Sequence, residues 1–293
     1  MLDIVIMDDK ANHNKYKNLM ILMSGGDRDF GLLHISKNGF LKKFLFLCGV
    51  ILRCRRRTVL IGSENNIYFM LLTILSSKRV IVDDGTEVFH KHDTHKTFGF
   101  FKRLIFSALS NRIPVHRYSI LRNANHRKQA IEYFQKTFVE NNKIDDECAL
   151  IILSPLCEDG IITADDYLDV LEATALYFTS MQKIQRFIIA VHPRSSADII
   201  AMSQKKMSDF AQSIVWCPET VVEFAVFQLD NIPRCLCSFE STASLIAERI
   251  LPANVSHFCY KLPVSKMRKY KRERELISEK YSQLFDGVYI NAD

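Results

Sequence analysis

Short runs of apolar and β-branched residues alternate with longer segments of helical periodicity through most of the chain. Near-continuous apolar strands separated by helices are typical of parallel sheets covered on both faces, so the pattern predicts an α/β protein. The predicted strands are Asp3–Met7, Leu19–Met23, Thr58–Ile61, Arg79–Val82, Ala149–Leu153, Arg186–Val191, Ser213–Val215 and Arg234–Cys237. The predicted helices are Ile67–Ser76, Phe98–Ser110, Lys128–Val139, Ala164–Thr179, Ala197–Ala211, Pro218–Gln228, Ser241–Ile250 and Val264–Leu284.

A polar stretch, Asn141–Glu147, lies between a predicted helix and a predicted strand. It predicts a domain boundary that divides the chain into residues 1–145 and 146–293, each near a typical domain length. We expect two Rossmann-like domains whose sheets face a shared cleft, because ligands of open α/β sheets bind beyond the carboxyl ends of the strands. The residues that directly follow each strand are therefore the first candidates for function.

The composition of the 293 residues, 48% hydrophobic and 25% charged, is normal for a soluble globular protein. The longest apolar run, residues 44–52, is too short to span a bilayer. The N-terminus carries acids in place of the basic region of a signal peptide. The eight cysteines are scattered without paired CxxC clusters, which indicates reduced, mostly buried thiols in a cytosolic protein. Trp216 and Cys217 are expected in the core.

The net charge of +6 is concentrated in two basic clusters, Arg53–Arg57 and Lys266–Arg272. Such clusters attract anionic partners, either nucleic acid or a membrane face. A solvated helix face is an equally good interpretation of the second cluster. No nucleic-acid-binding motif accompanies either cluster, so a nucleic-acid partner is not expected.

Polar side chains follow four of the predicted strands. They are Asp83-Asp84, Ser154, His192-Pro193 and Ser241-Thr242. An acid, an imidazole and hydroxyl groups suit the transfer of a group from a phosphate leaving group, in which a base activates the nucleophile and donors receive the phosphate. Each has an ordinary alternative: Asp-Gly as a turn, a lone histidine as a structural residue, and Ser-Thr as a helix cap.

These motifs together resemble the bacterial sialyltransferase and polysialyltransferase families, which share an acidic-acidic-glycine motif, a His-Pro motif and a Ser/Thr pair. The resemblance covers about residues 58–250, and the segment Leu153–Thr163 is similar to the opening of the second domain in those families. Transferases that use CMP-Kdo have similar elements. The resemblance implies a GT-B fold and an inverting transfer of a sialic acid-type sugar or Kdo from a CMP-activated donor.

The resemblance also assigns roles at the acceptor side and at the leaving group. One carboxylate of Asp83-Asp84 would be the general base; we favour Asp83, with Asp84 supporting the turn or the acceptor. His192 matches the histidine that donates a hydrogen bond to the CMP phosphate. Pro193 fixes the backbone so that the imidazole is aimed into the cleft.

On the donor side, the resemblance assigns the phosphate to Ser241 and Thr242. Glu223 is similar to a glutamate that binds the ribose, with Glu219 as the alternative, and Ser154 would lie beside the nucleotide. No cofactor and no metal are implied, since the CMP-sugar is itself the donor substrate.

Three features fit less well. Near its N-terminus the sequence reads Val5-Ile6-Met7-Asp8-Asp9, without the Thr-Pro-type turn of the families, which leaves the acceptor site least defined. The second acidic turn, Glu158-Asp159-Gly160, is interpreted as structural. His90, His92, Asp93 and His95 follow no helical or strand period that would place them on one face, so a metal site is not expected there.

The sequence thus predicts a cytoplasmic enzyme, peripheral on the inner face of the bacterial inner membrane, that builds capsule, lipopolysaccharide or lipooligosaccharide. Its expected partners are a CMP-activated acidic sugar, a glycan or glycolipid acceptor, and the membrane surface. The alternatives are a non-catalytic GT-B-like protein whose basic faces bind membrane or nucleic acid, and a transferase or epimerase that uses a UDP-sugar.

Overall fold

A computed structural model describes residues 2–7, 30–35, 48–52, 54–56, 58–61, 74–82, 115–118, 123–138, 143–218 and 222–291. The chain divides into two compact units, one formed by residues 1–13 and 21–128 and the other by residues 14–20 and 129–293. The division of roles between an acceptor-side domain and a donor-side domain stays a prediction.

The first unit contains two small parallel sheets. In one, β1 (Leu2–Met7) pairs with β2 (Phe30–Ile35). In the other, β4 (Lys78–Val82) lies between β3 (Thr58–Ile61) and β5 (Val115–Tyr118). The predicted strands that begin at Asp3, Thr58 and Arg79 are confirmed, whereas β2 and β5 were not predicted.

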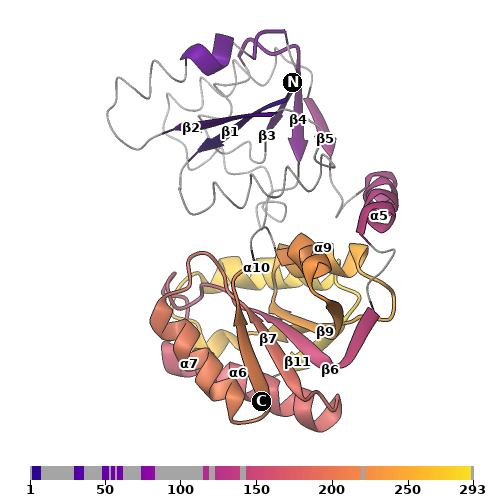
Figure 1. The fold of residues 1–293 in the computed structure, drawn as a ribbon. Helices are drawn as coiled ribbons and strands as arrows, with labels where there is room; N and C mark the ends of the chain where they lie inside the picture. Colours follow the sequence, from indigo (N-terminus) through magenta and orange to yellow (C-terminus); the bar gives the residue numbers. More distant parts are fainter. Residues whose placement is uncertain are drawn as a thin grey trace. The chain divides into compact units, whose positions relative to one another are not determined.

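The second unit is built on a six-stranded parallel sheet with the order β11-β10-β9-β6-β7-β8 (Figure 1). Its strands are β6 (Lys143–Ile152), β7 (Arg186–Ala190), β8 (Gln212–Trp216), β9 (Asn231–Phe239), β10 (Ser256–Lys261) and β11 (Val288–Asn291). The chain runs from β6 outward to β8, returns to the other side of β6 as β9, and runs outward again to β11. This is the order of a doubly wound Rossmann-type sheet, with its switch point between β6 and β9.

One helix precedes β6, and the others connect the strands of this sheet. They are α5 (Ala124–Phe138), α6 (Ala164–Met181), α7 (Ala197–Ser208), α8 (Val222–Ala225) with η3 (Val226–Gln228), α9 (Thr242–Ile250), η4 (Val264–Lys266) and α10 (Lys271–Ser282). Figure 1 shows α6 and α7 together at one side of the sheet and α9 with α10 at another. The predicted α/β class is therefore confirmed, and the described sheets of both units are parallel.

Serine and threonine caps fix where three of the helices begin. Thr163 Oγ1 accepts from the backbone N–H of Asp166 at 2.9 Å at the start of α6. Ser196 caps α7 and Ser241 caps α9 in the same way, through the N–H groups of Ile199 and Ala243. Each such cap satisfies one of the backbone donors that a helix N-terminus leaves without an intrahelical partner.

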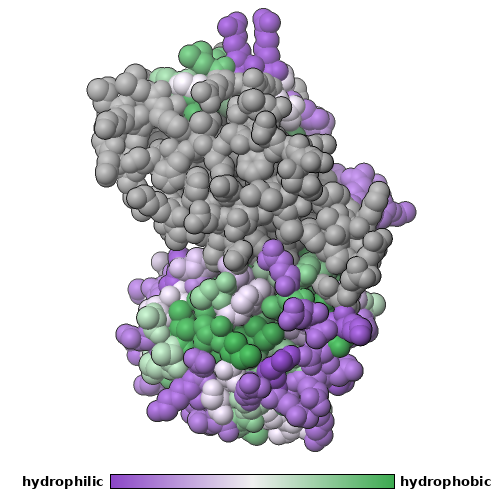
Figure 2. All heavy atoms as spheres, viewed as in Figure 1, coloured by the Kyte–Doolittle hydropathy of each residue, from purple (hydrophilic) through white to green (hydrophobic). Residues whose placement is uncertain are grey.

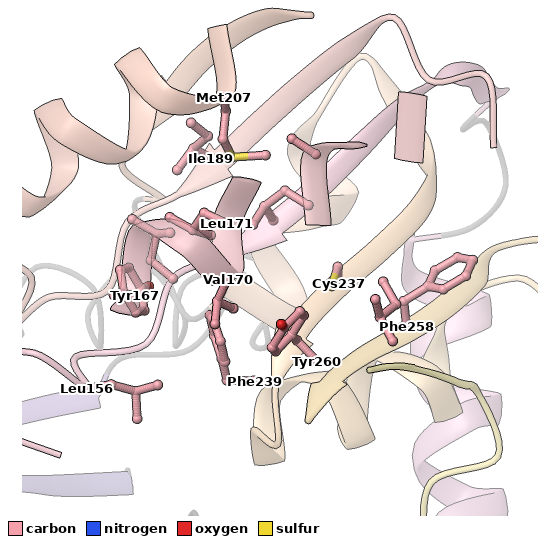
Figure 3. Close-up of a cluster of buried hydrophobic side chains, with 14 of the residues drawn as sticks. Leu156, Tyr167, Val170, Leu171, Ile189, Met207, Cys237, Phe239, Phe258 and Tyr260 are labelled. Carbon is pink, nitrogen blue, oxygen red and sulfur yellow. The ribbon is translucent and has the colours of Figure 1, made fainter. Parts of the chain in front are cut away.

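The core of the second unit is a continuous apolar cluster between the sheet and its helices (Figure 3). Tyr167 of α6 stacks on Phe239 at the end of β9, with ring centroids 5.3 Å apart. Phe239 also contacts Tyr260 of β10, and Phe258 meets Phe178 edge to face. Aromatic packing therefore links α6 to the two strands beyond the switch point.

Several predicted elements differ from the structure. The polar residues of 143–147 belong to β6, so the strand starts six residues before the predicted Ala149 and runs through the expected boundary at 145. The helix predicted over Val264–Leu284 is interrupted between η4 and α10, and β10 and β11 were not predicted. Residues 74–76 form a turn and irregular structure where a helix was predicted. The strand predicted over 19–23 and the helix predicted over 98–110 lie outside the described residues.

Four cysteines of the sheet region, Cys148, Cys235, Cys237 and Cys259, are buried free thiols, as expected. Cys217, however, is exposed because β8 is the edge strand of the sheet, and the expectation that it lies in the core is wrong. Among the described residues, no helix is both long enough and apolar enough to cross a bilayer.

Candidate active site

The parallel sheet of the second unit brings the predicted donor-side residues to one edge. All six strands run in the same direction, so their carboxyl ends lie together. Ser154 follows β6, His192 follows β7, and Ser241 follows β9, and these three strands are neighbours. Ser154 and Ser241 thus flank the switch point, where ligands of doubly wound sheets bind.

His192 and Pro193 form the first half of a tight turn at the end of β7. The backbone N–H of Ser195 donates to the carbonyl oxygen of His192 at 2.9 Å, which makes Pro193 the second residue of a β-turn. Proline suits that position because its ring sets φ in advance. Within the same turn, the backbone N–H of Arg194 donates to Nδ1 of His192 at 3.1 Å. With Nδ1 used as an acceptor, the neutral imidazole carries its proton on Nε2 and presents it as a donor.

Two acidic residues of the loop after β6 hold the His-Pro loop in place. Asp159 accepts two hydrogen bonds from the guanidinium of Arg194, at 2.7 and 3.1 Å. Glu158 accepts from the backbone N–H of Ser196 at 2.6 Å, where α7 begins. Gly160 completes the turn at φ +65°, a conformation that L side chains rarely adopt. The contacts of Glu158-Asp159-Gly160 are structural, in agreement with the interpretation made from the sequence.

The position of Ser154 is tied to the end of β9 through a buried tyrosine. The backbone N–H of Ser154 donates to Oη of Tyr167 at 3.2 Å, and the Tyr167 ring stacks on Phe239. Burial raises the pKa of Tyr167 far above its ordinary value, so the group remains a neutral hydroxyl. The strand ends on the two sides of the switch point are therefore coupled by one rigid side chain.

Ser241 and Thr242 stand at the N-terminus of α9, as predicted. Ser241 is the N-cap and Thr242 is the first helical residue, and both are half-buried at the carboxyl edge. A helix N-terminus presents backbone N–H groups and the positive end of the helix dipole, a combination that suits a phosphate. The capping role and the phosphate role are compatible, because the cap uses the Ser241 hydroxyl as an acceptor from Ala243 N–H.

A buried charge pair beneath α9 was not found by sequence reasoning. Glu240, directly before Ser241, is 3% exposed, and its Oε2 lies 3.5 Å from Nη2 of Arg274 in α10. Burial raises the pKa of Glu240, while a hydrogen bond from Ser278 and the charge of Arg274 act in the opposite direction. Its other oxygen, Oε1, has no hydrogen-bond partner. The sequence did contain one signal for this pair, because Glu240 is an acid that shortly follows a predicted strand and stands directly before the Ser-Thr pair.

The remaining candidate residues are less defined. Glu223 lies in the short helix α8, which packs against α9, and burial raises its pKa. Glu219, Asp83 and Asp84 lie outside the described residues, as do the histidines near position 90. The last described residue before the acidic pair is Val82, the end of β4. Within the part of the chain that the structure describes, no group of three or more His, Cys, Asp or Glu side chains could hold a metal ion.

Comparison with known proteins identifies the family. The model of the alpha-2,8-polysialyltransferase family matches residues 59–260, more than two thirds of the 293 residues. The chain belongs to the alpha-2,8-polysialyltransferase family. A search of curated proteins finds no match. The resemblance inferred from the motifs is thereby confirmed, and this polysialyltransferase-family chain is a sialyltransferase-type glycosyltransferase.

The family match contains both the strand-end motifs and the acidic pair. It begins in β3 and ends at Tyr260 in β10, so it includes Asp83-Asp84, His192-Pro193 and Ser241-Thr242. The segment that forms α10 and β11 lies beyond it. Arg274, which holds Glu240, therefore comes from outside the matched region.

Proposed function

We propose that this polysialyltransferase-family chain is an inverting glycosyltransferase that moves a sialic acid-type sugar, or Kdo, from a CMP-activated donor to a glycan hydroxyl. The supporting observation is that Ser154, His192 and the N-terminus of α9 meet at the carboxyl edge of adjacent strands, beside the switch point of a Rossmann-type sheet. Together with the family match, this favours a nucleotide phosphate as the group held there.

In this proposal the donor-side residues stabilise the departing CMP. Nε2–H of His192, the hydroxyl groups of Ser241 and Thr242, and the first amides of α9 donate hydrogen bonds to the phosphate oxygens as charge develops on them. Loss of one such donor typically lowers the rate by about 10²–10³-fold. Glu223 accepts from the ribose hydroxyls, and Ser154 lies beside the nucleotide. The developing charge is met by these donors, and we propose that no metal ion is needed.

The acceptor is activated by an acid of the first unit. The carboxylate of Asp83, or of Asp84, takes the proton of the acceptor hydroxyl as its oxygen attacks the anomeric carbon. The new C–O bond forms while the bond from that carbon to the phosphate oxygen breaks, and CMP leaves with the electron pair. A positioned base contributes about 10²–10⁴-fold. The two units would form a GT-B arrangement with donor and acceptor between them.

We place the reaction in the synthesis of bacterial surface polysaccharide, with a glycan or glycolipid acceptor at the cytoplasmic face of the inner membrane. The family match and the predicted donor class support this proposal. The basic clusters of the chain suit such a location.

The test is to incubate the purified full chain with CMP-Neu5Ac or CMP-Kdo and a saccharide acceptor, in the presence of a metal chelator, and to measure the release of CMP. We expect acceptor-dependent release. Asp83→Ala should abolish transfer and keep CMP binding, whereas His192→Ala should weaken both. Thermal shifts with CMP and UDP separate the rivals: stabilisation by UDP alone would favour a UDP-sugar enzyme. Stabilisation by neither nucleotide, with no turnover, would leave a non-catalytic binding protein.

A further inference from the structure

Exposed aliphatic and basic side chains gather at one end of the first unit. Leu52, at the end of the helical residues 48–52, is 63% exposed, and Ile74 and Leu75 are 39% and 38% exposed. Arg55 and Arg56 are exposed beside them. Figure 2 shows hydrophobic side chains next to protruding hydrophilic ones at this end of the unit. Large exposed apolar groups that lie together in a patch mark interaction surfaces more often than single ones do.

The two segments that carry these residues are held together. The backbone N–H of Arg56 donates to the carbonyl oxygen of Leu75 at 2.8 Å. The segments enter neighbouring parallel strands, with Thr58 of β3 opposite Lys78 of β4. They therefore form one surface at the amino edge of this sheet, which we name the amino-edge patch: Leu52, Arg55, Arg56, Ile74 and Leu75.

The sequence of the amino-edge patch carries only positive charge. Residues 48–61 contain four arginines and no acid, and residues 74–82 add Lys78 and Arg79, again without an acid. Exposed leucine and isoleucine among arginines suit the boundary between head groups and acyl chains of an anionic bilayer. Nucleic acid is a poorer fit, because the patch offers no exposed aromatic ring or amide for base contacts.

The topology also separates this patch from the expected chemistry. Asp83-Asp84 follows Val82 at the carboxyl end of β4, whereas the patch lies at its amino end. Roughly 15 Å of strand separates the two edges. A membrane bound at the amino edge would leave the carboxyl edge open for substrates.

We propose that the amino-edge patch docks this chain on an anionic lipid surface. The proposal names the surface through which the chain would reach the membrane in the proposed function. It rests on that function only for the biological role of the docking. Of the two basic clusters, it assigns the docking to Arg53–Arg57 and not to Lys266–Arg272. Part of the second cluster is already used within its own unit, since Lys266 lies 3.3 Å from Asp169 and 3.6 Å from Asp166.

The experiment is co-sedimentation of the full chain with vesicles of phosphatidylcholine, alone or mixed with phosphatidylglycerol, at about 0.1 M salt. We expect binding to the mixed vesicles only. Arg55→Glu should reduce the partition coefficient about tenfold or more, since each cation near an anionic surface contributes about fivefold. Leu52→Ser should reduce it by about the same factor through lost apolar insertion.

Matched controls come from the second unit. Arg272→Glu reverses an exposed arginine of the other basic cluster, and Leu176→Ser replaces a leucine that is 53% exposed on α6. Both should bind vesicles like the original chain. The proposal would be overturned if these controls lost as much vesicle binding as the patch variants, or if the original chain bound neutral vesicles equally well. It would also be overturned if the chain bound duplex DNA and only the Arg55 variant lost that affinity. A dimer that only Leu52→Ser dissociates would likewise overturn it.

The vesicle assay contains neither donor nor acceptor, so it is independent of the proposed reaction. The patch variants should keep full turnover of CMP-sugar on a free saccharide acceptor and an unchanged circular dichroism spectrum. Turnover without selective vesicle binding would remove the docking proposal alone. Selective vesicle binding without any turnover would remove the enzymatic proposal alone.

Discussion

The Glu240–Arg274 pair allows a quantitative test of how the segment beyond the family match supports α9. The side chains are 2% and 12% exposed, and the closest contact, Oε2 to Nη2, is 3.5 Å. Oε1 of Glu240 and Nε of Arg274 have no hydrogen-bond partner. The pair is therefore buried and incompletely hydrogen-bonded, a situation in which desolvation offsets most of the Coulomb attraction.

This geometry predicts a marked difference between single and double substitutions. Glu240→Leu leaves the guanidinium of Arg274 buried without its counter-ion, and Arg274→Met leaves the carboxylate of Glu240 in the same state. Each should lower the free energy of unfolding by about 3–5 kcal/mol. The double variant removes both charges together with their desolvation penalty, so it should lie within about 1–2 kcal/mol of the original chain.

Urea denaturation at pH 7 measures these differences. The single tryptophan of the chain, Trp216 at the end of β8, reports on the second unit by fluorescence. The control cycle uses the exposed pair Lys266–Asp169, where the side chains are 31% and 62% exposed. Its coupling should be only about 0.2–1 kcal/mol. If the two single losses at Glu240 and Arg274 simply add in the double variant, the two charges are not coupled and the reasoning is refuted.

Two further predictions concern stability. Burial lowers the pKa of His257 from 6.5 to about 4, so this group favours the folded state above pH 6.5 and loses that contribution as the pH falls toward 4. The shift corresponds to about 3 kcal/mol, and urea titrations from pH 7.5 to 4 should show a shallower acid loss in His257→Leu than in the original chain. At Gly287, an added Cβ would lie 2.3 Å from the carbonyl oxygen of His257, which is backbone and cannot rotate away. Gly287→Ala should therefore lower the unfolding free energy by about 1–3 kcal/mol or more, while Gly49→Ala, with nothing within 4 Å, should not destabilise the chain; equal effects in thermal melts would contradict this.

The sequence predicts a strand well where the strand is an apolar run. β3 and β7 are nearly continuous apolar runs, and their observed bounds agree with the predicted ones to within one residue. β10 reads Ser-His-Phe-Cys-Tyr-Lys, which has neither an apolar run nor strict alternation. Its four middle residues are buried, with Phe258 packed edge to face on Phe178 of α6, a contact that no local pattern reveals. Tertiary packing, rather than local propensity, makes this segment a strand.

The misjudged helix at 264–284 has a similar cause. Met267 is buried, and the backbone N–H of Arg268 donates to the carbonyl oxygen of Ile161 in the loop after β6. These long-range contacts hold the chain out of helical geometry until Tyr270, which adopts φ 57° before α10 begins. A run of basic residues of good helix propensity carries no signal of such a contact.

In the candidate site, too, some residues could be placed from the sequence and others could not. His192, Ser154 and Ser241 could be placed from sequence, because the carboxyl ends of parallel strands share one edge whatever the loops do. The Glu240–Arg274 pair could not, since its members are 34 residues apart and joined only by packing of α10 beneath α9.

This division has a consequence for how the function can be dissected. The residues proposed for CMP all belong to the second unit, whereas the proposed base follows β4 of the first. Donor affinity and proton abstraction should therefore be separable by mutation: in the proposed mechanism, His192→Ala changes a group that contacts the donor in both the ground state and the transition state. Asp83→Ala removes the proposed base, which the proposed mechanism needs only when the acceptor hydroxyl reacts. If the two single variants lost CMP affinity equally, Asp83 would have to lie beside the nucleotide. A different residue would then have to be the base that activates the acceptor.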